Sequence, residues 1–287
     1  MVAVVELSSG PGTTAAYARA ALSLVPGFTR SGNALPDVEV RRRGVTVDRA
    51  HLAAYDRVCG FRLTDTLPAT YPHVLAFPLA MRLMTAPDFP LPLIGLVHVT
   101  NRITVHRPIP AGAALDLSVR ATDLRDHPRG RQFDIVATAA LDGAEVWRGL
   151  STYLRLGPPP SAGTPANASP SPEADSTRSG SAWEVPARVG TDYAAISGDR
   201  NPIHTSLLGA RLFGFRRPIA HGMWTKAHAL AALEGRLPEA YTVDVTFKKP
   251  LLLPASATFT ATPATDGWSF TVASRHPHLT GLITTHD

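Results

Sequence analysis

The sequence has very little cysteine and no long apolar run. Cys59 is the one cysteine among 287 residues, so no disulfide can form within the chain, as expected in a reducing cytosol. No uninterrupted apolar stretch approaches the ~18 residues of a membrane-spanning helix. The first ten residues lack the basic region and the long apolar run of a secretory signal peptide. These absences predict a soluble cytoplasmic protein with no membrane partner.

Concentrated charge and ligand clusters are missing as well. The net charge is +5 and the pI is about 9.7, but the basic residues are scattered. The densest run, at 41–43, contains no aromatic residue, so we interpret it as a solvated face and expect no nucleic-acid partner. No His, Cys and carboxylate residues have the spacing of metal ligands, and no phosphate-binding glycine loop is present. We therefore expect neither a metal nor another cofactor.

The chain does contain a clear boundary. Residues 157–182 are rich in Pro, Ser, Ala and Gly and include no large apolar residue, whereas hydrophobic residues make up 44% of the sequence as a whole. A segment of this composition buries too little surface to offset the entropy lost on ordering. We predict an N-terminal domain at 1–156, a flexible linker at 157–182 and a C-terminal domain at 183–287.

The two predicted domains repeat one order of elements. Each begins with a short tyrosine-bearing helix, continues with a long apolar helix led by proline, and ends in strands of period two. The expected helices lie at 49–60, 71–84, 190–199 and 217–233, and the strand patterns begin at 96 and 241. This order predicts an α+β fold, in which a central helix is wrapped by about four antiparallel strands in each half. We expect the halves to pack sheet to sheet as a pseudo-dimer.

The stretch ISGDRNPIHTS, residues 196–206, places an acid, an amide and an imidazole within six residues. Pro202 prevents a regular helix between Asp199 and His204, so a loop can turn both side chains toward one point. A carboxylate and an imidazole that share one water molecule can perform general acid–base catalysis, and Asn201 can orient the water or the substrate. The alternative interpretation of these residues is a structural Asx-type turn.

A second motif, GFRRPIAHGMW at 214–224, leads from a loop into the second apolar helix. We expect the first turn of this helix near 219–222, where backbone N–H groups are free and the helix dipole is positive. Gly222 has no side chain to cover its N–H, so this group can donate to a thioester oxygen and stabilise an enolate. The neighbouring His221 is expected to pack or bond locally, with substrate binding as the alternative.

Together, YAAISGDRNPIH and GARLFGFRRPIAHGM resemble the signature of the MaoC-like, R-specific enoyl-CoA hydratase (hydratase 2) family, which has the hot-dog fold. The resemblance implies that Asp199 and His204 hold the catalytic water, with Asn201 in the same polar cluster and the Gly222 N–H on the thioester oxygen. It implies reversible syn hydration of a trans-2-enoyl thioester to a (3R)-hydroxyacyl thioester in fatty acid metabolism, without metal or redox cofactor. We expect Asp199 to be the base toward water and His204 to relay a proton to C2.

The N-terminal domain departs from this signature. Phe61 stands where an acid is required after the matching glycine, Gly60, and Asp65 has no histidine at the corresponding spacing. The resemblance therefore implies a double hot-dog protein whose first domain is degenerate and accommodates the acyl chain. The apolar run at 73–84 suits such a chain, and a plain core helix is the alternative interpretation.

Four cations flank the predicted site in the sequence: Arg216, Arg217, Lys248 and Lys249. Solvated charge is one interpretation, and contact with the phosphates of CoA or of a carrier-protein arm is the other. The expected substrate is accordingly an acyl-CoA or an acyl-carrier protein. A hot-dog acyl-CoA thioesterase and a non-catalytic acyl-binding module are the alternative functions. The chain is expected to act as a monomer, which is itself a pseudo-dimer, or as a homodimer.

Overall fold

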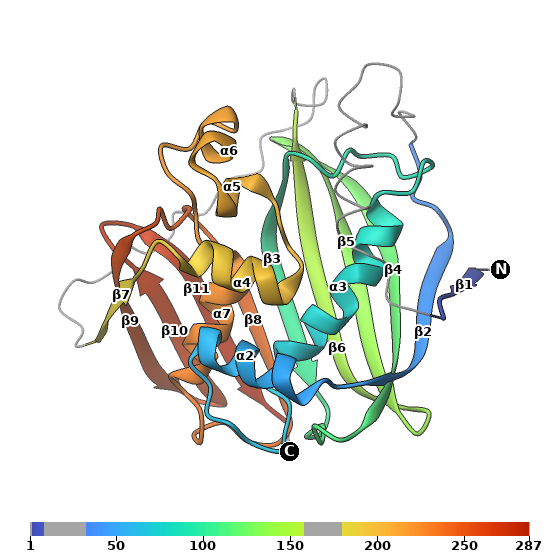
Figure 1. The fold of residues 1–287 in the computed structure, drawn as a ribbon, viewed down its shortest axis with the longest axis horizontal. Helices are drawn as coiled ribbons and strands as arrows, with labels where there is room; N and C mark the ends of the chain where they lie inside the picture. Colours follow the sequence, from blue (N-terminus) through green and yellow to red (C-terminus); the bar gives the residue numbers. More distant parts are fainter. Residues whose placement is uncertain (1, 9–32, 158–179, 287) are drawn as a thin grey trace.

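The computed structural model describes residues 2–8, 33–157 and 180–286 (Figure 1). The greater part of the predicted linker lies outside these residues, and its last two positions, from Ser181, already belong to a strand. The elements of the first half are β1 (Ala3–Glu6), β2 (Val38–Thr46), α2 (Arg49–Cys59), α3 (Tyr71–Met84), β3 (Leu96–Val105), β4 (Ala114–His127), β5 (Gly130–Leu141) and β6 (Ala144–Leu156). Those of the second half are β7 (Ser181–Val185), α4 (Val189–Ser197), α5 (Pro202–Thr205), α6 (Leu207–Leu212), α7 (Gly222–Ala231), β8 (Tyr241–Phe247), β9 (Ala255–Ala264), β10 (Gly267–Ala273) and β11 (Pro277–Thr285).

The described strands form a single sheet of 11 strands in the order β1-β2-β4-β5-β6-β3-β8-β11-β10-β9-β7. Apart from β1, this order is symmetric about its centre, so each strand of one half has a counterpart in the other. The halves meet where β3 pairs antiparallel with β8, from Thr100↔Thr246 to Val105↔Tyr241. The expected sheet-to-sheet packing is therefore wrong. Main-chain hydrogen bonds along one shared edge join the halves, instead of side chains between two faces.

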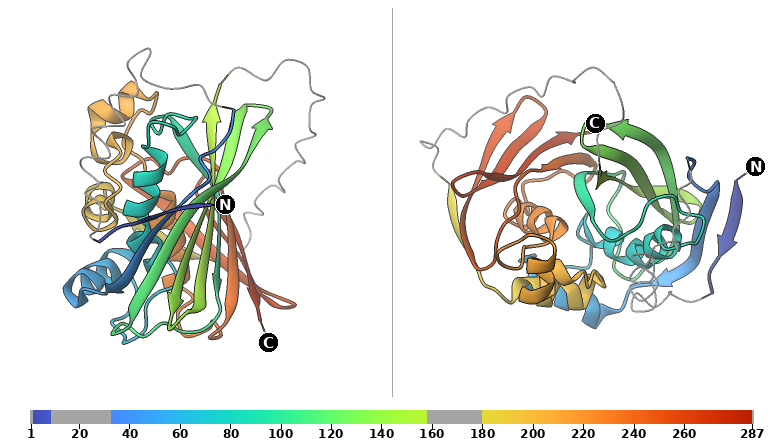
Figure 2. Two further views of the ribbon diagram at one scale, coloured as in Figure 1. Left: turned by 90° about the vertical axis from the view of Figure 1, so that its right-hand side faces the viewer. Right: turned by 90° about the horizontal axis from the view of Figure 1, so that it is seen from above.

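The helices lie on one face of this sheet, and the sheet curves around them (Figure 2). α3 and α7 are the apolar helices of the two halves, and both bury large side chains, such as Leu79 and Met81 in α3 and Trp224 and Leu230 in α7. Each of these helices is wrapped by the strands of its own half. The predicted α+β, double hot-dog fold is confirmed.

Local sequence signals explain the ends of the short helices. Gly60 ends α2 with φ 87° and Gly198 ends α4 with φ 74°, both in the left-handed region that favours glycine. The side chain of Asp48 caps the start of α2 by accepting from the N–H groups of Ala50 and His51. The two halves therefore share the same bend after their first helix, as the sequence predicted.

The helix α7 begins later than predicted, at Gly222. The backbone before it is bonded elsewhere, because the N–H of Ala220 donates to the O of Leu251 and the N–H of Leu253 donates to the O of Pro218. These bonds tie the loop to the corner after β8, so the loop cannot join the helix. Gly222 thus becomes the first helical residue.

The strands β1, β2 and β7 were not predicted. β2 and β7 each add a fifth strand to their own half, and β1 adds a sixth to the first half. The basic run at 41–43 lies in β2. There Arg41 pairs with Glu39 at 2.6 Å, and Arg43 pairs with Glu6 at 3.3 Å. These half-exposed ion pairs agree with the interpretation of the run as a solvated face.

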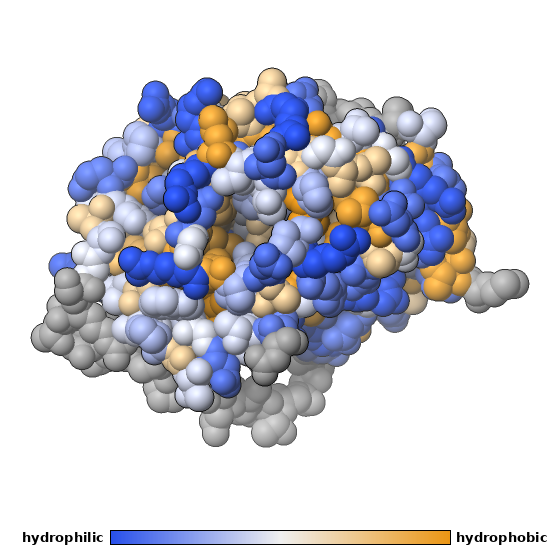
Figure 3. Space-filling model, turned by 90° about the horizontal axis from the view of Figure 1, so that it is seen from below, coloured by the Kyte–Doolittle hydropathy of each residue, from blue (hydrophilic) through white to orange (hydrophobic). Residues whose placement is uncertain are grey.

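In the part of the chain that the structure describes, no helix combines the length and the apolar character needed to cross a membrane. Figure 3 shows the underside of the molecule, relative to the view of Figure 1. On this side, hydrophilic and hydrophobic residues are intermixed. A cluster of exposed apolar side chains lies instead on α6.

A buried lysine spans the junction between the halves. Lys226 of α7 is 0% exposed, and its Nζ donates to the O and Oδ1 of Asn101 in β3, at 3.1 and 2.6 Å. A third bond, of 3.1 Å, reaches the O of Val243 in β8. Burial lowers the pKa of Lys226 well below its usual value. One side chain therefore ties α7 to both strands of the junction.

Lys226→Met removes the ammonium while keeping an apolar stem of similar length, so Asn101 Oδ1 loses a buried donor. We expect the free energy of unfolding to fall by about 1–3 kcal/mol, measured by urea denaturation. Lys249→Met, at an exposed position, is the matched control and should change it little. A Lys226→Met protein as stable as the wild type would contradict the role given to this lysine.

Candidate active site

The loop between α4 and α6 is bent by its own polar side chains. Ser197 Oγ donates to the O of Tyr193 and accepts from the N–H of Asp199. Asp199 Oδ1 in turn accepts from the N–H of Asn201, at 3.2 Å. The Oδ1 of Asn201 caps α5 by accepting from the N–H of Ile203. The side-chain oxygen of Asn201 thus has the turn-forming role of the alternative interpretation, within a loop that lines a cavity.

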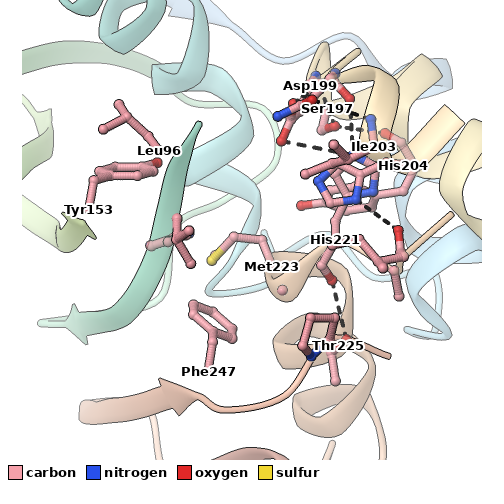
Figure 4. Close-up of a pocket in the computed structure, with 18 of the residues that line it drawn as sticks. Leu96, Tyr153, Ser197, Asp199, Ile203, His204, His221, Met223, Thr225 and Phe247 are labelled. Atoms are coloured by element: carbon pink, nitrogen blue, oxygen red, sulfur yellow. Dashed lines mark hydrogen bonds and ion pairs between the residues drawn. The ribbon is translucent and has the colours of Figure 1, made fainter. Parts of the chain in front are cut away.

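Three side chains converge at this turn (Figure 4). A carboxylate oxygen of Asp199 and one ring nitrogen each of His204 and His221 lie within 4.8 Å of one another. Two hydrogen bonds of about 2.8 Å to one shared water span about 4.6 Å at a tetrahedral angle. Asp199 and His204, which the sequence predicted as a pair, therefore have a separation that one water molecule or one substrate hydroxyl can bridge.

The backbone fixes the tautomer of His204. Its Nδ1 lies 2.8 Å from the O of Ile219, and because a carbonyl oxygen only accepts, Nδ1 carries the proton. Burial lowers the pKa of His204, and the nearby Asp199 carboxylate and the bond to Ile219 offset only part of this effect. The ring is therefore neutral at physiological pH, with Nε2 as a hydrogen-bond acceptor.

His221 lies behind His204, and its 2% exposure keeps it from solvent. The two rings stack with centroids 3.7 Å apart, and His221 Nε2 donates to the backbone O of Asp199 at 3.0 Å. Burial lowers the pKa of His221 to about 3, so it stays neutral. His221 thus holds both the backbone of Asp199 and the ring of His204 in place.

These three side chains form a set that sequence spacing did not reveal, because His221 is 22 residues from Asp199. One metal ion bound by both rings would require their in-plane lone pairs to converge. Rings stacked with 26° between their planes keep those lone pairs nearly parallel. Nδ1 of His204 and Nε2 of His221 donate to backbone carbonyls, so the acceptor nitrogens are Nε2 of His204 and Nδ1 of His221. Stacking of the two rings is therefore the feature that does not suit one shared metal ion.

The N–H of Gly222 lies at the positive end of α7. Gly222 is the first residue of this helix, so its N–H has no acceptor within the helix. The glycine also satisfies a steric requirement that the sequence did not reveal, since a Cβ there would come within 2.8 Å of the Phe247 ring. The N–H of Gly222 and the ring of Phe247 therefore lie close together in the lining of the cavity described next.

A cavity of about 770 Å³ extends from these groups to the first half. Its walls combine the α4–α5 loop, the start of α7 and the end of β8 with residues of α3 and β3. Most of the side chains that α3 and β3 contribute are apolar, among them Val74, Phe77, Met81, Met84 and Leu96. The run at 73–84 therefore does both things that the sequence suggested, because it packs in the core and lines the cavity.

Two histidines in this wall belong to no motif of the sequence. His73 and His98 both line the cavity. His98 stacks on Tyr153 with ring centroids 4.6 Å apart and makes a tilted contact with Phe247 at 4.9 Å. Burial lowers the pKa of His73 to about 4 and that of His98 to about 3, so both are neutral. No sequence signal identifies them, because their position depends on the pairing of β3 with β8.

The four predicted cations divide into two groups. Lys248 and Lys249 line the cavity and are exposed, whereas Arg216 and Arg217 are not among the described residues that line it. Arg217 donates to the O of Pro254 at 3.3 Å. Arg200, which the sequence analysis did not single out, also lines the cavity and is exposed.

The corresponding place in the first half is filled. Phe61, the residue at the position of Asp199, stacks on Tyr55 with ring centroids 6.2 Å apart. Asp65 points away into solvent, with its side chain 94% exposed, and pairs with Arg49 at 2.7 Å. The expected absence of an acid–base pair at this place agrees with these contacts.

A histidine of the first half supports the site of the second. His51 Nε2 lies 2.9 Å from the O of Ile196, three residues before Asp199, and its Nδ1 lies 2.9 Å from the hydroxyl of Tyr71. The carbonyl can only accept, so Nε2 carries the proton and Tyr71 donates to Nδ1. This chain of bonds fixes the end of α4, from which the loop with Asp199 departs.

These features define a class of protein: a double hot-dog fold with an acid–base pair and a helix N-terminus beside an apolar cavity. Residues 168–263 match the model of the "MaoC like domain" family. The chain is 38% identical over 271 residues to 3-hydroxyacyl-thioester dehydratase X of Mycobacterium tuberculosis, covering 92% of this chain and 95% of that protein. The chain therefore belongs to the MaoC-like dehydratase family.

Two further comparisons agree with this assignment. The crystal structure of HtdX of Mycobacterium tuberculosis superposes with a TM-score of 0.76 and 37% identity, covering 86% of this chain and 100% of that one. 3-Hydroxyacyl-thioester dehydratase Y of the same organism is 28% identical over 170 residues, covering 55% of this chain and 58% of that protein.

His51→Ala removes the bond to Ile196, so the loop that carries Asp199 loses a support. We expect kcat for enoyl-CoA hydration to fall about tenfold with little change in KM, because small misplacements of reacting groups are costly. His51→Gln keeps a donor near Ile196 and should recover most of kcat. Equal losses of kcat in both variants, or none in His51→Ala, would contradict this positioning role.

Proposed function

We propose that the chain is a hydro-lyase that dehydrates (3R)-hydroxyacyl thioesters to trans-2-enoyl thioesters, and catalyses the reverse hydration. The observation that carries the proposal is the shared position of three groups at one end of the cavity. They are His204, whose Nε2 is an acceptor, the Asp199 carboxylate and the N–H of Gly222, and all three residues line the same cavity. The names of the M. tuberculosis relatives support the same reaction.

In the dehydration direction, the thioester oxygen accepts a hydrogen bond from the N–H of Gly222, which stabilises the negative charge that develops on this oxygen in the enolate. The neutral His204 removes the C2 proton through Nε2, and the nearby Asp199 carboxylate stabilises the imidazolium that forms. The imidazolium then returns this proton to the C3 hydroxyl as the C3–O bond breaks. One enoyl thioester and one water result, and the enzyme regains its starting state.

This scheme changes one expectation drawn from the sequence. Asp199 was expected to be the base toward water, with His204 as the proton donor to C2. A neutral His204 whose proton sits on Nδ1 has no proton on Nε2 to donate at the start of hydration. The tautomer therefore favours His204 as the first base, and Asp199 as the group that orients the water and stabilises the imidazolium. Since one imidazole serves both C2 and C3, addition is syn.

The remaining predicted residues support these groups. Asn201 shapes the turn that presents Asp199, and its amide also lines the cavity. His221 positions Asp199 and His204 through its hydrogen bond and its stacked ring, and it also lines the cavity. In this proposal the degenerate half supplies the apolar wall for the acyl chain. Lys248 and Lys249, which line the cavity, contact the phosphate of a CoA or carrier-protein arm.

We also propose that the chain works in the cytoplasm as a monomer or homodimer. The single cysteine, Cys59, is buried, and burial raises its pKa, which suits an unreactive thiol in a reducing compartment. Residues of both halves complete the cavity within one chain, so a second copy is not needed to form the site. No metal or redox cofactor takes part in the scheme.

The test uses crotonyl-CoA hydration by His204→Gln and Asp199→Asn, with circular dichroism to confirm folding. We expect each variant to lose about 10²–10⁴-fold in kcat. Because a neutral His204 is required and its pKa is lowered, wild-type kcat/KM should fall only when the pH drops below the ordinary histidine range. Near wild-type turnover by either variant would overturn the site assignment. Release of free CoA thiol without hydration would instead indicate a thioesterase.

A further inference from the structure

An exposed apolar helix stands beside the mouth of the cavity. On α6 and the residue after it, Leu207, Leu208, Leu212 and Phe213 are 47, 69, 76 and 40% exposed. Leu212 and Phe213 also line the cavity, so this surface, which we call the α6 patch, is continuous with the route to Asp199. A patch of large apolar side chains at the mouth of a site is typical of a surface that another molecule covers.

The charge around the α6 patch has a single sign. Residues 200–233 include no Asp or Glu, whereas Arg200, Arg211, Arg216 and Arg217 lie among them. Arg211 belongs to α6 itself and is exposed. Across the mouth, Lys248 and Lys249 are exposed and line the cavity with Arg200. Among the described residues that line the cavity, Asp199 is the sole acid, and it lies inside.

Two kinds of thioester could approach such a mouth. The nucleotide of CoA would use the cations at the rim, but its small polar surface would leave Leu208 uncovered, because Leu208 lies outside the cavity lining. A protein that carries its acyl group on a phosphopantetheine arm can cover the leucines and neutralise the arginines at the same time. Charge complementarity of this kind speeds association and selects the partner.

We propose that the α6 patch is the docking surface for an acidic acyl carrier protein, with Leu208 and Leu212 against its apolar contacts and Arg211 and Arg200 against its carboxylates. The proposal rests on the proposed function, since the docked protein delivers the thioester to Asp199 and His204. It adds that the acyl-carrier protein, and not acyl-CoA, is the substrate that the surface of this chain recognises.

The test compares one (3R)-hydroxyacyl chain carried on a purified bacterial acyl carrier protein with the same chain on CoA. Leu208 and Arg211 lie outside the cavity lining, so Leu208→Gln/Arg211→Glu should lower kcat/KM for the carrier-protein substrate at least about tenfold and leave that for CoA within about twofold. Leu63→Gln/Arg57→Glu is the matched control, because Leu63 is 73% exposed and Arg57 is exposed on α2. It should leave both substrates unchanged.

Charge reversal on the partner gives a second readout. A carrier protein in which one helix glutamate is replaced by lysine should restore part of the kcat/KM that Arg211→Glu loses. Added salt should lower kcat/KM of the wild type for the carrier-protein substrate more than that of Arg211→Glu. Equal losses on both substrates, or no loss, would overturn the docking proposal. A different result would also overturn it: the wild type binds anionic lipid vesicles, and Leu208→Gln abolishes this binding without changing the kinetics with the carrier-protein substrate. Failure of wild type on both substrates would instead refute the proposed function.

Discussion

The pairing of β3 with β8 is the contact on which the rest of the molecule depends. It joins the six strands of the first half and the five strands of the second into one continuous sheet, and it sets the helices of both halves side by side on the inner face of this sheet. The cavity forms across this junction, with His98 from β3 and Phe247 from β8 in contact in its wall. Lys226 reinforces the same junction from inside. Without the pairing of β3 with β8, the polar residues around Asp199 and the apolar wall from α3 and β3 would not line the same cavity.

The symmetry of the two halves makes their difference informative. Both bend after their first helix at a left-handed glycine, Gly60 or Gly198, so the bend that precedes Asp199 in the second half also exists in the first. In the first half, Phe61 occupies the position of the acid and stacks on Tyr55. That half contributes packing and cavity wall in place of proton transfer. It also supports the other half directly, since His51 holds the carbonyl of Ile196 and α7 reaches back through His228 to the O of Cys59.

The sequence was sufficient for features encoded within a few residues. The bend at 196–206 and the approach of Asp199 to His204 follow from proline, glycine and capping side chains that are neighbours in the chain. The start of α7 at Gly222 depends instead on main-chain bonds between the preceding loop and the corner after β8, which are distant in the sequence. The fold class followed from the repeated order of helices and strands. The edge-to-edge joining of the halves did not, because alternation within a strand does not say which strand lies next to it. For the same reason, the roles of His51 and His98 emerged only with the three-dimensional arrangement.

The central claim is that one neutral imidazole moves a proton between C2 and the oxygen at C3 on a single face of the substrate. Hydration of crotonyl-CoA in D₂O, with the product analysed by NMR and by chiral chromatography, tests it most directly. The account predicts a (3R)-hydroxybutyryl product that carries one deuterium at C2, added syn to the hydroxyl. An (S) product, or deuterium added on the opposite face, would contradict it.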